Sequence, residues 1–143
     1  MAVITDELRA FLDGQPVGVL ATAALDGHPR QSLVYFTRDD ERLLISTLAD
    51  RLKTRDAERG GWASLCVMGL QPPYPSATFS GPARILTEGI GPPTAAIAGR
   101  ITGAAEPPEP MTDEALAEIG RVILAIDVDR VTAANYIPAG DTP

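Results

Sequence analysis

Three β-favouring segments joined by two short polar turns constrain the fold of this chain more than any other feature. The segments are PVGVLATAAL (16–25), RQSLVYFTR (30–38) and LLIST (43–47), and the turns between them are DGHP and DDER. Turns this short connect antiparallel strands, because a crossover between parallel strands needs a dozen or more residues. The sequence therefore predicts an antiparallel meander near its N-terminus.

Helical patterns flank this meander and follow it. TDELRAFLDG (5–14) has the caps and the apolar spacing of a short amphipathic helix. A second helix is expected from Arg51 to Arg59, with Asp50 as its N-cap and the glycine pair at 60–61 ending it. Two further helices are expected, a weak one over residues 93–103 and a firmer one over residues 112–120.

The other β-favouring segments lie in the second half of the chain. WASLCVM (62–68) is typical of a buried strand, and residues 76–88 predict a strand with a kink or bulge at Gly81-Pro82. Residues 121–137 predict a strand followed by an extended tail. Meanders with helices inserted between them indicate the α+β class. We expect one domain over residues 1–143, an antiparallel six-stranded β-barrel with short peripheral helices.

Charge and composition exclude several classes of protein. The formal net charge of −7 argues against nucleic acid as a partner, because duplex binding requires many cations facing phosphates. No apolar run approaches the ~20 residues that span a bilayer, and the first residues lack the pattern of a signal peptide. A single cysteine, Cys66, fits a reducing compartment. We expect a cytoplasmic protein that does not associate with membranes.

A basic cluster stands out in this acidic chain. DRLKTRDAERGG (50–61) places Arg51 and Lys53 in the first turn of the predicted helix, where the helix dipole favours acids. A bound anion would relieve this conflict, and Ser46 and Thr47 before the helix would add hydroxyl donors. The alternative is an ordinary solvated helix face, with the cations balanced by the acids at positions 50, 56 and 58.

Few other residues indicate chemistry. His28 is expected in a solvated turn and Cys66 in a buried strand, so neither suggests a metal ligand or a nucleophile. Trp62 and Phe79 are expected in the core. Tyr74 and Tyr136 lie on irregular segments and are candidates for the wall of a site. We predict no catalytic acid, base or nucleophile and no metal site.

The order of these segments resembles a known family. GVLATAALDGHPRQSLV, then LLIST, then ADRLKTRDAERGGWASLCV are similar to the pyridoxamine 5′-phosphate oxidase-like split β-barrel superfamily, and DVDRV near residue 129 fits its last strand. The pair of VLATAALDGHP with the later R-x-K-x-R looks closest to the actinobacterial branch that binds the deazaflavin coenzyme F-420. The resemblance implies a split β-barrel that forms a homodimer with two cofactor sites at its interface.

The resemblance also implies a function. An oxidoreductase of this kind holds F-420 and transfers a hydride to a small electron-poor acceptor, with the cofactor performing the chemistry. The residues implied to bind the cofactor are Ser32, Leu33, Ser46, Thr47, Arg51, Leu52, Lys53 and, toward the partner's cofactor, Tyr74. Two alternatives remain open: an FMN-binding flavin reductase or pyridoxamine-phosphate-oxidase-like enzyme, and a non-catalytic cofactor carrier. The proline-rich segment 89–111 is expected on the substrate side.

Overall fold

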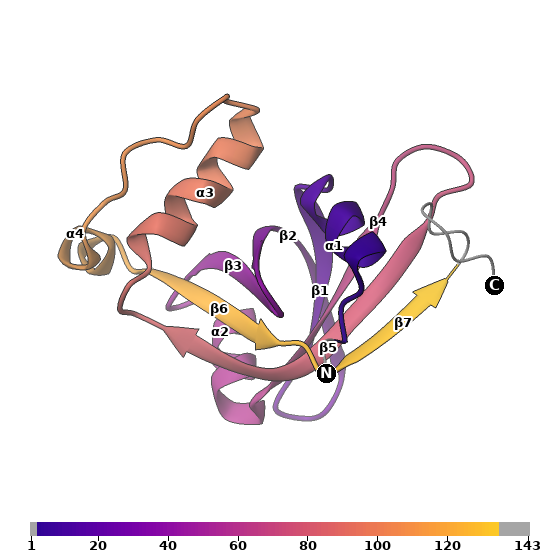
Figure 1. Ribbon diagram of the computed structural model, residues 1–143. Coiled ribbons are helices and arrows are strands. Elements are labelled where there is room, and N and C mark those ends of the chain that lie inside the picture. Colours follow the sequence, from indigo (N-terminus) through magenta and orange to yellow (C-terminus); the bar gives the residue numbers. More distant parts are fainter. Residues whose placement is uncertain (1–2, 135–143) are drawn as a thin grey trace.

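The computed structural model describes residues 3–134 (Figure 1). The elements, in chain order, are α1 (Asp6–Asp13), β1 (Val17–Ala23), β2 (Pro29–Asp39), β3 (Arg42–Leu48), α2 (Leu52–Gly60), β4 (Trp62–Met68), β5 (Ser76–Leu86), α3 (Gly91–Thr102), α4 (Asp113–Glu118), β6 (Arg121–Asp127) and β7 (Arg130–Ala134). The expected meander is present as β1, β2 and β3. Tyr136 and the end of the expected tail lie outside the described residues.

The strands form the expected closed barrel with one strand added. Their order is β4-β1-β2-β3-β6-β5-β7, all neighbours are antiparallel, and a further pairing of β4 with β5 closes six of them into a barrel. The split β-barrel of the α+β class is therefore confirmed. Part of the expected tail is β7, which pairs with the first half of β5 after a break at Val128 and Asp129.

The barrel interior is filled by alternate residues of its strands. In β2, Val34 and Phe36 are buried and Tyr35 between them faces outward, as the two-residue period of a strand requires. Phe79 of β5 is fully buried, as predicted. The prediction for Trp62 was wrong, because this first residue of β4 keeps 45% of its surface exposed. Its place directly after the Gly61 turn puts the ring at the rim of the barrel.

The strand β5 bends where glycine was expected to kink it. The register of β4 with β5 runs without a bulge through Gly81 and Pro82, but there β5 exchanges β7 for β6 as its second partner. A Cβ atom on Gly81 would lie 1.9 Å from the carbonyl oxygen of Asp127. Glycine is therefore required at this position by the close approach of two backbones.

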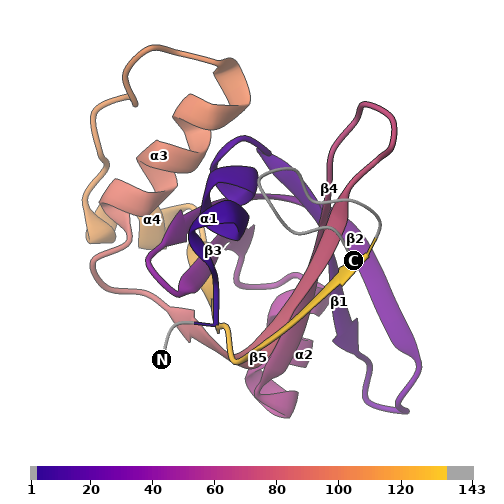
Figure 2. The same cartoon turned by 45° about the vertical axis from the view of Figure 1, so that its right-hand side comes forward.

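The helices α3 and α4 cover the outer face of β3 and β6. Figures 1 and 2 both draw them together on the side of the barrel away from the β4–β5 loop. A second, smaller apolar cluster joins them to the barrel, with Leu44, Ile90, Ile97, Leu116, Ile123 and Ala125 buried in it. Arg100 holds the C-terminal end of α3 against β2 and α1. Its guanidinium donates hydrogen bonds to the carbonyl oxygens of Phe36 (2.8 Å) and Leu12 (3.0 Å).

The helix α2 begins one residue later than expected. Arg51, not Asp50, is its N-cap residue, and the side chain of Arg51 makes no capping hydrogen bond with the helix. The predicted end is confirmed, since Gly61 adopts the left-handed conformation with φ of 65° and donates to the carbonyl oxygen of Ala57. None of the described helices combines the length and the hydropathy that crossing a bilayer would require.

Candidate functional site

A shallow groove of about 270 Å³ lies where β2, β3 and the start of β6 meet the N-terminus of α2. We call it the basic groove. Its lining comes from segments far apart in the sequence: Leu33, Val34 and Tyr35 of β2, Ser46, Thr47 and Leu48 of β3, Arg51 and Lys53 at α2, and Arg121 of β6. The pairing of β3 with β6 sets Arg121 opposite Leu48 and so brings the last cation in.

Arg51 and Lys53 are cations without a counter-charge among residues 3–134. Neither forms an ion pair or a side-chain hydrogen bond with another described residue, whereas most other arginines in the described range do, Arg38 and Arg42 among them. Partial burial lowers the pKa of Lys53, and the positive charge of Arg51 lowers it further. The groove thus holds positive charge at an electrostatic cost that a bound anion would offset.

The backbone at the start of α2 adds to the positive charge of the groove. Arg51 is in an extended conformation, no acid occupies the first turn of α2, and no described acceptor is bonded to the N–H groups of Leu52 and Lys53. The first N–H groups of a helix lack partners within it, and with the helix dipole they favour a negative charge. Two cationic side chains and two backbone amide groups at one helix end can together bind the oxygens of a phosphate group.

Ser46 and Thr47 are next to each other but face opposite sides of β3. Ser46 lies on the outer face, in the groove, and its Oγ accepts from the Arg121 guanidinium at 3.4 Å. Thr47 is 4% exposed, with its Oγ1 3.5 Å from that of Thr54, which donates to the carbonyl oxygen of Leu48 at 2.7 Å. Ser46 is thus available to a ligand, while Thr47 mainly joins β3 to α2.

A buried carboxylate holds α2 against the barrel. Asp56 is 3% exposed and accepts hydrogen bonds from Thr22 (2.9 Å), Arg30 (2.8 Å) and Arg59 (3.2 Å). Burial by itself raises the pKa of Asp56, but these three donors outweigh it and hold the pKa below its ordinary value. The interpretation of Asp56 as a solvated counter-charge to Arg51 and Lys53 was therefore wrong.

The chain matches a known family along nearly all of the described range. Residues 4–134 match the family described as pyridoxamine 5′-phosphate oxidase. The chain belongs to this family. The resemblance inferred from the three N-terminal segments is thus confirmed, and it extends through α3, α4 and the last strands.

Several solved structures have the same fold as this chain. An F-420 reductase is 24% identical, with a TM-score of 0.69 over 87% of this chain and 94% of that one. A conserved hypothetical protein from Mycobacterium tuberculosis is 22% identical, with a TM-score of 0.72 over 99% and 95% of the two chains. A protein from Mycobacterium smegmatis described as FAD and heme binding is 21% identical, with a TM-score of 0.73 over 98% and 75%. At these identities the likeness is one of fold.

In this member of the oxidase family, five of the eight residues expected to bind a cofactor line the basic groove: Leu33, Ser46, Thr47, Arg51 and Lys53. Leu52 is exposed on α2 beside them. Ser32, one residue before Leu33 in β2, does not line the groove. Arg121 was missed, since only the long-range pairing of β6 with β3 brings it there.

Tyr74 lies away from the groove of its own chain. It is 52% exposed in the loop that joins β4 to β5, beyond the Met68 end of β4, whereas α2 adjoins the Trp62 end. Figures 1 and 2 draw this loop and α2 at opposite ends of the molecule. Tyr74 therefore does not line the basic groove of its own chain.

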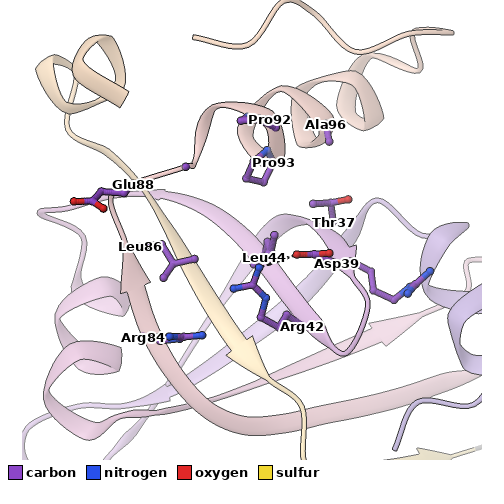
Figure 3. A pocket seen from close by; sticks show the side chains of 12 residues that line it. Thr37, Asp39, Arg42, Leu44, Arg84, Leu86, Glu88, Pro92, Pro93 and Ala96 are labelled. Carbon is purple, nitrogen blue, oxygen red and sulfur yellow. Dashed lines mark hydrogen bonds and ion pairs between the residues drawn. The ribbon is translucent and has the colours of Figure 1, made fainter. Parts of the chain in front are cut away.

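A larger cavity lies elsewhere and has balanced charge. It occupies about 540 Å³ between α3 and the outer face of β2, β3 and β5, with Pro92, Pro93 and Ala96 above Arg42 and Arg84 (Figure 3). The Arg42 guanidinium is paired with Asp39 at 2.7 Å, and Arg84 is 3.6 Å from Asp127. Its cations are already compensated, so this cavity suits an anion less well than the basic groove does.

Proposed function

We propose that this protein is an oxidoreductase that binds the deazaflavin coenzyme F-420 in the basic groove and transfers a hydride to a small electron-poor organic acceptor. The observation that carries the proposal is the pair of uncompensated cations, Arg51 and Lys53, beside the uncapped start of α2. Membership of the oxidase family and the similarity to an F-420 reductase support the choice of cofactor class.

The residues of the groove fit the phosphate of such a cofactor. Arg51 and Lys53 would pair with it, the amide groups of Leu52 and Lys53 would donate to its oxygens, and Ser46 would add a hydroxyl. When bound, the reduced coenzyme supplies two electrons and one proton as a hydride to a carbon of the acceptor, and water supplies the second proton. The protein's part is to bind and orient, so the absence of a catalytic acid or base among the groove residues is compatible with this role.

We also propose that the working unit is a homodimer. The groove is open on the side of Leu33 and Tyr35, two large side chains of β2 that are exposed in the single chain. A second copy seated there would cover this apolar surface, and its β4–β5 loop would bring Tyr74 to the site. Exposed apolar side chains next to a ligand groove are typical of surfaces that a partner completes.

A titration of the purified protein tests the cofactor assignment. We expect micromolar or tighter F-420 binding, followed by the coenzyme's fluorescence, and at least a tenfold loss in Lys53→Ala, which corresponds to about 1.4 kcal/mol. Arg55→Ala is the matched control, because Arg55 is an exposed cation of the same helix that does not line the groove. It should change the affinity less than about threefold.

The same titration with FMN distinguishes the alternatives. Tighter binding of FMN than of F-420, weakened equally by Lys53→Ala, would move the protein to the flavin-binding alternative with the same phosphate site. Binding of neither ligand, or equal losses in Lys53→Ala and Arg55→Ala, would contradict the groove assignment and leave a solvated helix face. Tight F-420 binding without turnover of any acceptor would favour a carrier.

Cofactor affinity is expected to depend on pH through Lys53. In the free protein the pKa of Lys53 lies below its ordinary value of 10.5. A bound phosphate favours the charged amine and therefore raises this pKa again. Affinity should therefore be constant below the free-state pKa and fall as pH rises through it, with proton uptake on binding in that window. Calorimetry at a series of pH values below 10.5, in two buffers of different ionisation enthalpy, measures this uptake. Equal uptake by Lys53→Ala would contradict the assignment.

A further inference from the structure

A groove that shares no lining residue with the basic groove runs along α3. The cavity of about 540 Å³ between α3 and the outer face of β2, β3 and β5 continues into a cleft of about 340 Å³ beside the second half of the helix. Thr37 of β2 and Ala96 of α3 line both parts, so they form one depression, which we call the α3 groove. A ligand in it would not touch the residues proposed to bind the coenzyme.

The middle of the α3 groove is apolar. Pro92, Pro93 and Ala96 of α3 lie on one side of it, across from Leu44 of β3 and Leu86 of β5 (Figure 3). In the cleft, most lining residues have small side chains: Gly99, Gly103 and Ala104. Proline rings opposite leucine side chains offer apolar surface to both faces of an aromatic ring, and the volume lies in the range of small-molecule sites.

Two arginines at the edge of the groove have free hydrogen-bond donors. Arg42 uses one guanidinium nitrogen, which donates to Asp39 at 2.7 Å. Arg84 donates no hydrogen bond to any residue in the range 3–134, since the carboxylate of Asp127 lies 3.6 Å from its Nε. A guanidinium carries five N–H donors, so most of the donors of this pair are available to a ligand.

The charge around these donors is nevertheless balanced. Each guanidinium has a carboxylate nearby, and Glu88 adds a further negative charge to the lining. The start of α3 supplies no donor against this charge, because two of its first residues are prolines, and Asp113 accepts from the N–H groups of Gly89 and Ile90 at 2.9 and 3.2 Å. Free donors in balanced charge favour an acceptor atom without a formal charge, such as an amide oxygen.

We propose that the α3 groove is a second ligand site, which binds an elongated, uncharged aromatic amide. One ring lies between the prolines of α3 and the leucines of the barrel, and the amide oxygen accepts hydrogen bonds from Arg84 and Arg42. The rest of the molecule extends along the helix into the cleft. This site is independent of the proposed coenzyme function, because the two grooves have no lining residue in common.

The test uses N-phenylbenzamide, which has two rings and one amide, as the probe. Amide chemical shifts of the isotopically labelled protein should change around Leu86 and Ala96 and saturate as the probe is added. Ala96→Phe fills the groove where its two parts meet and should weaken binding at least tenfold. Ala98→Phe is the matched control, because Ala98 belongs to the same helix but lines a different cavity, and it should change the affinity less than about twofold.

Arg84→Leu tests the hydrogen bonds separately. We expect it to weaken binding about threefold to tenfold, whereas Arg130→Leu, at an exposed arginine of β7, should change it less than about twofold. An unchanged affinity in Arg84→Leu would overturn the role of the arginines.

A charged analogue tests the balance of charge. 3-(Phenylcarbamoyl)benzoate adds a carboxylate to the probe and should bind no more tightly than the uncharged amide. Tighter binding of this anion would overturn the assignment of an uncharged ligand. Failure of the unmodified protein to bind N-phenylbenzamide, or equal losses in Ala96→Phe and Ala98→Phe, would overturn the site itself. None of these outcomes depends on whether the protein binds F-420.

Discussion

Gly81→Ala is expected to destabilise the barrel by more than about 4 kcal/mol, enough to prevent folding in a domain of ordinary stability. The added Cβ would lie 1.9 Å from the carbonyl oxygen of Asp127, which belongs to the backbone and cannot rotate away. Relief would require β5 and the β6–β7 junction to separate where β5 exchanges its partners. Soluble yield, circular dichroism and, where protein is obtained, urea unfolding measure the effect.

Gly60→Ala is the matched control for this substitution. Gly60 ends α2, and a Cβ atom there would meet no atom within 4 Å. Alanine should therefore be neutral or stabilise the protein by about 0.5 kcal/mol, since it lowers the conformational entropy of the unfolded chain. A Gly81→Ala variant that unfolds at the same urea concentration as Gly60→Ala would contradict the close approach of the two backbones.

Asp56→Asn is expected to lower the free energy of unfolding by about 3 kcal/mol near neutral pH. The change removes the negative partner of Arg30 and Arg59 in a buried position, and breaking a buried ion pair from one side costs about 3–5 kcal/mol. We expect the lower end because both arginines remain partly in water. Glu58→Gln, at an exposed acid of the same helix, should stay within about 0.5 kcal/mol of the parent.

The effect of Asp56 should depend on pH in a defined direction. Its folded-state pKa lies below the ordinary value of 3.8, so its charge stabilises the fold above that value and the stabilisation is lost as pH falls through the folded-state pKa. The difference in stability between the parent and Asp56→Asn should therefore shrink at pH below about 3.8. Urea unfolding at neutral pH and at acidic pH measures it. A constant difference would mean that Asp56 does not act through its charge.

Local patterns predicted the fold well because the barrel is built mainly from neighbours in sequence. The meander of β1, β2 and β3 follows from two short turns, and the end of α2 follows from its two glycines. The helix start was missed by one residue, since Asp50 has the side chain of an N-cap but Arg51 has the backbone conformation. Whether an aspartate caps a helix depends on the backbone conformation at the end of the preceding strand. The residue types alone do not determine this conformation.

The residues that line the basic groove were predicted in part, and those that escaped prediction depend on long-range pairing. Arg51 and Lys53 stood out because their charge conflicts locally with a helix N-terminus. Arg121 enters the groove only because β6 pairs with β3, which places it beside Ser46. Asp56 looked like a surface acid of a charged helix, and only the packing of α2 against β1 and β2 buries it with Thr22 and Arg30.

The path of the chain around α3 and α4 has a consequence for how such proteins diversify. Leu86 and Ile123 face each other in the β5–β6 ladder, so residues 87–120 leave the barrel and return to it at nearly the same place. Exchange of this segment between relatives would alter what α3 and α4 present beside the outer face of β3 and β6, and it would keep the barrel strands and the cations of α2. Selection can therefore act on this segment and on the basic groove separately, and a designer can graft a new segment onto an inherited frame.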